Sequence, residues 1–162
     1  MPAEISITFM RPVGFYYNLL SQIPLIKSQG FMAINYGGAQ KKPWVSPIDI
    51  AAAIAEEMES PFKGRKVRYV ASEEISSDEI ASILGSAIGK PDLKWIVISD
   101  EQQEKAMVSF GINPVIAAGL VEMNAAIRSG ELFEDYYKHR PVLGKVKIKD
   151  YAPEFAAIYN SK

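Results

Sequence analysis

The stretch that most constrains the fold lies at the start of the sequence, in residues 5–18. Its first half alternates apolar with polar residues, the period of two that indicates a strand with one buried face: Ile5, Ile7 and Phe9. Pro12 lacks a backbone N–H, and Gly14 permits backbone conformations that other residues resist, so a turn should follow. Ligands of open α/β sheets bind where the carboxyl ends of strands meet the next loop. We therefore take this stretch as the candidate ligand-facing edge.

The remaining sequence alternates strand and helix patterns to about residue 72 and is richer in helix patterns after it. We expect helices over residues 14–27, 46–58, 76–88, 99–110, 113–128 and 150–159. We expect strands over residues 5–10, 31–36, 66–71 and 93–98. Residues 37–45 and 131–149 should be mainly loop, with residues 142–148 as a candidate extended segment. This order predicts an α/β fold with a sheet-based part, residues 1–72, and a smaller helix-rich lobe, residues 73–162, in one compact unit.

Local signals also predict how the helices begin and which faces they bury. Ser46, Ser76 and Ser99 are expected N-caps, each followed three residues later by an acid or a glutamine, as in a capping box. Spacing predicts two buried faces in particular: Ile50, Ala51, Ile54, Ala55 and Met58 after Ser46, and Ile116, Leu120, Met123 and Ile127 after Asn113.

Charge and composition exclude several classes of function. The 162 residues carry 18 basic and 19 acidic side chains, well mixed, which argues against a nucleic-acid partner. Cysteine is absent, so disulfides, thiolate metal sites and cysteine nucleophiles are excluded. No apolar run approaches the roughly 20 residues of a membrane span, and the start lacks the layout of a signal peptide. We expect a cytoplasmic protein without a membrane partner.

Few residues suggest catalysis or metal binding. The single histidine, His139, has no second histidine at metal spacing and no adjacent nucleophile, so we expect it in a solvated loop. The acids around Glu57 and Glu73 lack metal-ligand context and suggest solvated faces. The pair of glycines at 37 and 38 is better explained by a turn than by a phosphate loop. Arg11, at the end of a predicted buried strand, needs a partner, either a structural acid or a ligand. We assign no catalytic residue and no metal ligand.

Five segments along the chain carry a family resemblance: Arg11-Pro12 with the aromatic run 15–20, Trp44 to Ala51, Ile88 to Pro91, Asn124 to Gly130 and Tyr151 to Ala156. In this order they resemble the second half of NmrA-like proteins, which belong to the atypical short-chain dehydrogenase/reductase superfamily alongside nucleoside-diphosphate-sugar epimerase-like proteins. The resemblance spans nearly the whole chain. This resemblance implies the C-terminal half of a Rossmann-like NAD(P)-binding fold with a small lobe over the cofactor cleft. It also implies that Arg11, Pro12, Val13, Gly14 and Phe15 border the nicotinamide side of that cleft.

The chain departs from this family in two motifs. The glycine-rich dinucleotide fingerprint is absent, and neither Tyr137 nor Tyr151 matches the family's Tyr-x-x-x-Lys pair. We therefore expect NAD(P) to be the family's cofactor but not to bind this chain alone, and we expect no independent catalysis.

These departures leave several functions open. One hypothesis is the substrate lobe of an NAD(P)-dependent oxidoreductase or epimerase. A second is a non-catalytic module that regulates or binds a small molecule, and a third is a self-associating remnant. The strand at residues 5–10 would then be an open edge, which predicts a homodimer or pairing with an upstream partner polypeptide.

Overall fold

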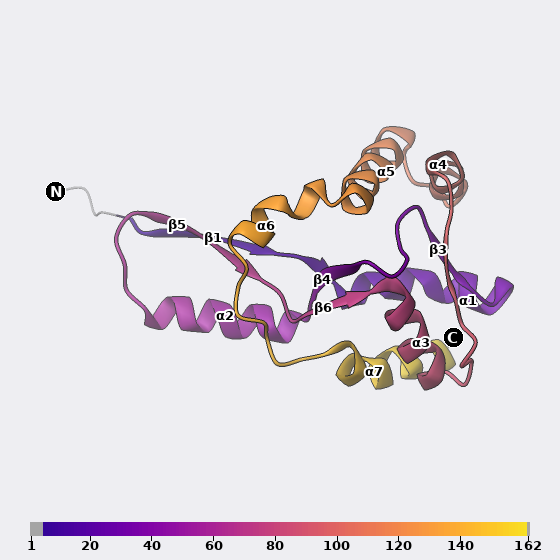
Figure 1. The fold of residues 1–162 in the computed structure, drawn as a ribbon, viewed down its shortest axis with the longest axis horizontal. Coiled ribbons are helices and arrows are strands. Elements are labelled where there is room, and N and C mark those ends of the chain that lie inside the picture. Colours follow the sequence, from indigo (N-terminus) through magenta and orange to yellow (C-terminus); the bar gives the residue numbers. More distant parts are fainter. Residues whose placement is uncertain (1–4, 162) are drawn as a thin grey trace.

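The computed structural model describes residues 5–161, in which three small sheets are flanked by helices (Figure 1). The strands are β1 (Ile7–Pro12), β2 (Gly14–Phe15), β3 (Met32–Ile34), β4 (Lys41–Val45), β5 (Arg65–Val70), β6 (Glu73–Ser76) and β7 (Trp95–Val97). The α-helices are α1 (Ile23–Gln29), α2 (Pro47–Glu59), α3 (Ser77–Ala87), α4 (Asp100–Ser109), α5 (Pro114–Ser129), α6 (Glu134–Lys138) and α7 (Ile148–Ser161). Two 3₁₀ helices are η1 (Tyr16–Gln22) and η2 (Glu131–Phe133).

Parallel pairing over long crossovers confirms the predicted α/β class. Strand β1 pairs with β5 in parallel, from Ile7 opposite Arg65 to Pro12 opposite Val70. Strands β3 and β7 are also parallel, and β4 lies between β2, which is parallel to it, and β6, which is antiparallel. Parallel neighbours require a crossover connection, which the helices between these strands provide.

The largest hydrophobic core lies between η1, α1, α3 and α7. Its fully buried side chains include Tyr16, Ile26, Ile80, Leu84 and Phe155. These residues come from both sides of residue 72, and the division into two parts at that residue stays a prediction. Within residues 5–161, none of the helices has the length and apolar character needed to cross a bilayer.

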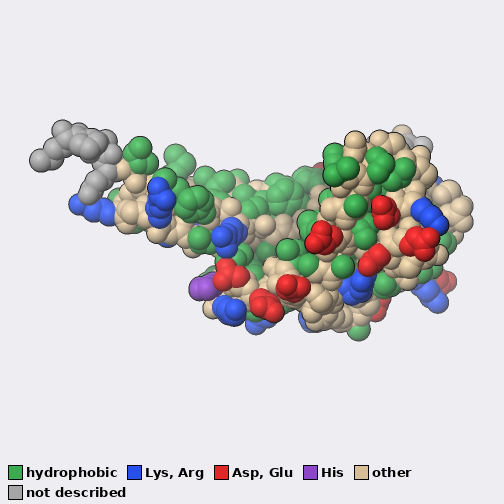
Figure 2. All heavy atoms as spheres, turned by 90° about the horizontal axis from the view of Figure 1, so that it is seen from above, with side chains coloured by type: hydrophobic (Ala, Val, Ile, Leu, Met, Phe, Trp, Pro, Cys, Tyr) green, Lys and Arg blue, Asp and Glu red, His purple; other side chains and the backbone are tan. Residues whose placement is uncertain are grey.

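The ribbon formed by β1 and β5 is covered by α2 on one face and open on the other. The Thr8 hydroxyl donates to Glu57 of α2 at 3.0 Å, so the neighbouring Phe9 points away from that helix. Phe9 and Val67 lie opposite each other and are 48% and 47% exposed. Figure 2 looks onto this side and shows apolar side chains along the ribbon. The expectation of a buried face for Ile5, Ile7 and Phe9 was wrong for these residues, because Ile5 and Phe9 are exposed and Ile7 is half-buried.

The face that α2 buries differs from the predicted one. Asp49 and Ala53 are buried, whereas Met58 is 83% exposed and Ile54 is also exposed. The ribbon face beneath α2 carries Arg68, whose guanidinium donates to the Ala53 carbonyl and the Glu57 carboxylate. Of the five predicted residues, Ile50 packs against the core with Ala53, and the other four are exposed. The polar contacts with Arg68 and the small apolar contact at Ala53 together orient α2.

Helix α5 is rotated from expectation in a similar way. Its buried residues are Ala117, Val121 and Asn124, whereas Ile116 and Met123 are exposed. The Asn124 side chain donates to the Asn35 side-chain oxygen at 2.7 Å, a contact between residues far apart in the sequence. That contact and the small Ala117 set the inner face.

Two predicted loops contain regular structure. Residues 41–45 form β4, in which Lys42 and Trp44 are buried. The strand was not predicted because two lysines and a proline are unusual in a buried strand. Residues 131–138 form η2 and α6, and the candidate extended segment is irregular until α7 begins at Ile148. The expected first helix starts at Tyr16 rather than Gly14, and β1 continues to Pro12.

Candidate functional site

The carboxyl ends of β1 and β5 bring together an arginine, a tyrosine and an aspartate. Arg11 Nη1 lies 3.0 Å from the Tyr69 hydroxyl and 3.1 Å from Asp135 Oδ2, and Tyr69 donates to the same carboxylate at 2.5 Å. The Tyr69 hydrogen bond holds the pKa of Asp135 below its usual value, with the nearby His139 and Arg11 adding to the effect. Tyr69 is also the main cause of the raised pKa of Arg11. Arg11 thus has the structural acid that we considered as one of its two expected partners.

Pro12 to Phe15 continue the same backbone edge from β1 into β2. The Val13 N–H donates to the Val70 carbonyl at 3.2 Å, and Phe15 lies opposite Val45 of β4. A methyl group added at Gly14 would lie 3.5 Å from the Trp44 ring, an ordinary contact. The five residues implied by the family resemblance are therefore contiguous at the end of the ribbon, and their role toward a cofactor stays a prediction.

A tyrosine cluster follows this edge. Tyr16 is buried and donates to Glu73 and to the Val146 carbonyl, both at 3.3 Å, and its ring stacks on Tyr151 at 5.7 Å. Burial, followed by the Glu73 charge, raises the pKa of Tyr16 far above its usual value. Among the described residues, the buried Tyr151 hydroxyl and Trp44 Nε1 have no hydrogen-bond partner, and each costs on the order of 1–3 kcal/mol.

Asp49 has a different role from the capping one predicted for it. The Ser46 hydroxyl accepts from the Ile48 N–H, as an N-cap should, but the Ser46 N–H donates to the Ser72 hydroxyl. Asp49 instead accepts from the Ser72 hydroxyl and from the backbone N–H groups of Lys145 and Val146. It therefore fastens the strap, our name for residues 139–147 between α6 and α7, to the start of α2.

A cavity of about 970 Å³ lies between α2, β5 and the strap. Arg11 to Phe15 are not among its lining residues, but Tyr69 and Asp135, the partners of Arg11, are. The cavity therefore adjoins the predicted ligand edge without including it. It is lined by Ile48, Asp49, Ala52, Ala53, Glu56, residues 67–71, Asp135, His139 and residues 141–146. No sequence pattern indicated this cavity, because its three walls come from segments that are far apart in the chain.

Three acids predicted to lie on solvated faces have structural partners. Glu57 accepts from Thr8, Lys66 and Arg68, which lowers its pKa to about 2, chiefly through the lysine and arginine hydrogen bonds. Glu73 accepts from Tyr16 and the Ile148 N–H. Glu74 accepts from Tyr136 and Arg140. His139 is exposed, as expected, and pairs with Asp135.

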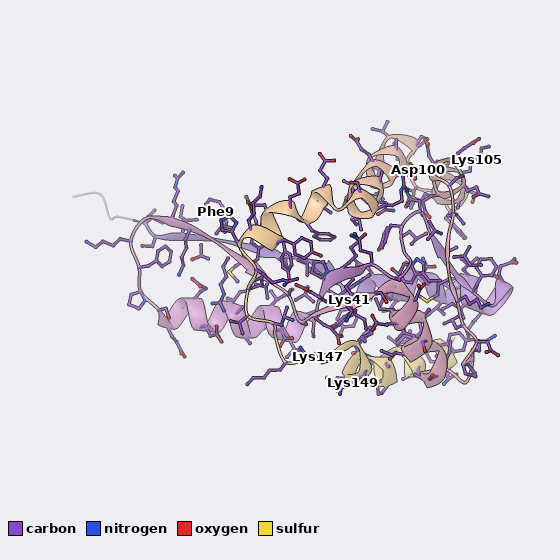
Figure 3. All side chains as sticks on the ribbon, in the orientation of Figure 1. Phe9, Lys41, Asp100, Lys105, Lys147 and Lys149 are labelled. Carbon is purple, nitrogen blue, oxygen red and sulfur yellow. The ribbon has the colours of Figure 1, made fainter. Side chains whose placement is uncertain are left out.

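A partly buried polar network at the end of β3 was not predicted at all. The fully buried Asn35 donates to Asp100 and accepts from Asn124, and Arg128 donates to both Asp100 and the Asn35 carbonyl. Arg128 and Asn35 lower the pKa of Asp100 to about 2. Asp100, labelled in Figure 3, lies at the start of α4, so the network joins α4 and α5 to β3. Its members satisfy one another, which indicates a structural role.

The described residues do not fit the pyrophosphate of a dinucleotide. Such a group needs free N–H groups at a helix N-terminus next to glycines. The first turns of α3 and α4 are closed by complete capping boxes and carry two acids each, and those of α2 and α5 are capped by Ser46 and Asn113. Groups of acids or histidines able to hold a metal ion are also absent from residues 5–161.

Comparison with known proteins finds one curated relative and several solved structures of similar fold. No family profile matches the chain. An NAD(P)H azoreductase from Xenophilus azovorans is 28% identical over 121 residues, which are 73% of this chain and 41% of the azoreductase.

Solved structures share the fold over most of the chain. An NADPH-dependent quinone oxidoreductase from Escherichia coli, complexed with NADPH, matches with a TM-score of 0.72 and 20% identity, over 91% of this chain and 52% of its own. A nucleoside-diphosphate-sugar epimerase from Staphylococcus aureus matches with a TM-score of 0.70 and 18% identity, over 90% and 51%. A triphenylmethane reductase from Citrobacter matches with a TM-score of 0.67 and 20% identity, over 93% and 53%.

These likenesses confirm the predicted resemblance at the level of the fold. The chain has the Rossmann-like fold of NAD(P)-dependent reductases and epimerase-like proteins, and it spans about half the length of the proteins that it matches.

Proposed function

We propose that this chain is the substrate-side half of an NAD(P)H-dependent reductase of the NmrA-like kind, and that it is not catalytic by itself. A second polypeptide unit carrying the glycine-rich motif would complete the cofactor cleft. The azoreductase and the reductases of similar fold support this reading for the family. The expected cytoplasmic location is part of the same proposal.

The open ribbon is the observation that carries the proposal. Parallel sheets are normally covered on both faces, because their crossovers place helices there. In the described residues, β1 has β5 as its one ladder neighbour, and the Phe9 and Val67 face lacks a covering helix. A strand beside β1 and a helix over Phe9 would bury both surfaces, and a dinucleotide-binding βαβ unit supplies such a pair.

In this proposal, Arg11 to Phe15 border the nicotinamide side of the completed cleft. They lie at the carboxyl end of β1, where ligands of such sheets bind. Arg11 has a side chain that is 52% exposed, so it remains accessible to a ligand while paired with Asp135.

Calorimetry with NADPH tests the proposal. We expect no binding by the 162-residue chain alone and measurable binding once it is mixed with the segment of a related reductase that carries the glycine-rich unit. Arg11→Ala should then weaken NADPH binding about tenfold, and Arg65→Ala, at the far end of the ribbon, should leave it unchanged. Micromolar binding by the chain alone, or none by the mixture, would contradict the proposal.

The same open face supports a second candidate, a non-catalytic module that acts as a homodimer and binds a small molecule. Two copies could cover each other's Phe9 and Val67 through an isologous contact. Light scattering at micromolar concentration separates the candidates, because the module requires a stable dimer without any added unit.

A further inference from the structure

The outer edge of β5 carries backbone groups without a ladder partner. Ile7 donates to the Gly64 carbonyl and Val13 to the Val70 carbonyl, so alternate residues of β5 face β1. Val67 and Tyr69 lie between those positions and direct their N–H and C=O groups to the other edge. There the Ala71 carbonyl accepts from the Gly144 N–H at 2.8 Å, yet no described strand pairs with the outward-facing backbone groups of Val67 and Tyr69. The strap thus supplies one rung at this edge and leaves two open.

This open edge is the floor of the 970 Å³ cavity. Residues 67–71 line it consecutively, so the hollow follows the β5 backbone rather than one side-chain face. Ala52 and Ala53 of α2 form one wall, and Val142 and Leu143 of the strap form the other. The result is a groove with an apolar lining beside an unsatisfied strand edge.

Two acids that line the groove have ion-pair partners, whereas one lysine does not. Glu56 pairs with Arg68 at 2.5 Å, and Asp135 pairs with Arg11 at 3.1 Å. Lys145 lies on the strap at the end where Gly144 meets Ala71, and in residues 5–161 its ammonium has no ion-pair partner. An occupant with a negative charge at that end would compensate it.

We propose that the groove binds an extended peptide segment, which adds as a strand to the outer edge of β5 and places an acidic group against Lys145. An extended backbone is the ligand whose alternating N–H and C=O groups match those of Val67 and Tyr69. An added strand lies about 4.8 Å from its neighbour, on the side of β5 that α2 and the strap flank. This site runs along the opposite edge of β5 from β1, and it shares Tyr69 and Asp135 with the Arg11 cluster.

A synthetic peptide of alternating valine and threonine, about six residues and roughly 20 Å long, is a suitable probe. One form has a free carboxyl terminus, and its twin is amidated. We expect the free-acid form to slow amide hydrogen exchange at Val67 and Tyr69, as measured by NMR on the full chain. Protection at neither residue would overturn the proposal.

Matched variants locate the binding in the groove. Ala52→Phe should fill the groove and weaken binding at least about tenfold, whereas Ala55→Phe, exposed on the same helix outside the groove, should change it less than about twofold. Lys145→Glu should weaken binding of the free acid about two- to fivefold relative to the amidated twin. Lys149→Glu, on α7 as labelled in Figure 3, should not. Equal losses in both members of either pair would contradict the proposal.

A second copy in the groove is a distinct outcome of the same experiment. In that case Val67 and Tyr69 would become protected without peptide as protein concentration rises, and sedimentation would show a dimer. That result would overturn peptide binding and assign the edge to self-association.

Discussion

At the scale of single residues, Asp49 joins three segments of the chain. Its carboxylate accepts from Ser72 after β5 and from two N–H groups of the strap. Gly144 passes so close that a methyl group there would overlap the carboxylate. The position of the strap therefore depends on one buried acid and one glycine.

Asp49→Ala should leave the buried Ser72 hydroxyl and two part-buried N–H groups without their acceptor. We expect a loss of about 3 kcal/mol in the free energy of unfolding, measured by urea denaturation. Asp78→Ala, an exposed acid in the first turn of α3, should cost less than about 1 kcal/mol. Equal costs would show that the contacts of Asp49 contribute little.

Glu57 makes the free energy of unfolding depend on pH in the acidic range. Lys66 and Arg68 stabilise its charged form and lower its folded-state pKa from 4.5 to about 2. Because the folded pKa is depressed, this stabilisation is present above about pH 4.5 and is lost as the pH falls toward about 2. Glu57→Gln should flatten the fall in the urea midpoint across that window. Glu59→Gln, exposed at the end of the same helix, should leave the fall unchanged.

Caps were predictable from sequence because they are local, and the contacts of Asp49 and Asn35 were not. Ser76 and Ser99 close their helices with the partners expected three residues later. Asp49 finds its partners 23, 96 and 97 residues away, and Asn35 meets Asn124 at a separation of 89. Nothing in the spacing of these polar residues distinguishes them from solvated ones.

At the scale of elements, most helices and strands lie where periodicity predicted, but two helices bury other faces. Apolar spacing identified α2 and α5 and then assigned Met58 and Ile116 to the core, where neither lies. The spacing of apolar residues shows that a helix has an apolar side. Which side is buried depends on the surface against which the helix packs. For α2 that surface combines the charged side chain of Arg68 with the apolar Met10 and Val70, and no local pattern in the α2 sequence reveals it.

The orientation of α5 can be tested with neighbouring residues. Ala117 is fully buried, so Ala117→Leu should overpack the site and cost about 1–3 kcal/mol. Ile116 is exposed, and Ile116→Ala should change stability by no more than about 0.5 kcal/mol. Thermal unfolding followed by circular dichroism measures both, and the reverse order would mean that the helix presents its predicted face.

At the scale of the whole molecule, the fold could be predicted because the segments that resemble NmrA-like proteins follow one another along the chain in the order of that family. The cavity could not, because its walls come from α2, β5 and the strap. For the ribbon, the sequence predicted an unpaired backbone edge at residues 5–10 but not an exposed side-chain face. That face is exposed because α2 lies on the other side of the ribbon.

Replacing the open face tests its use as an interface. Phe9→Thr with Val67→Thr keeps strand-forming residues and should change the stability of the chain by less than about 0.5 kcal/mol, while reducing self-association in sedimentation velocity. Val70→Thr, on the buried end of β5, should instead cost more than about 1 kcal/mol. Association that survives the double replacement would place the interface elsewhere.

The pairing of β1 with β5 also sets the order of events during synthesis. Arg11 meets Tyr69 across 58 positions of chain, and closing a loop of that length costs about 3–4 kcal/mol of chain entropy before the contacts form. A ribosome adding about 5–20 residues each second needs several seconds to deliver β5 after β1. During that interval β1 lacks its β5 partner, and its exposed apolar residues are free to meet other nascent chains. Yield in the cell should therefore depend on chaperones that hold the segment around β1, more than the stability of the finished fold would suggest.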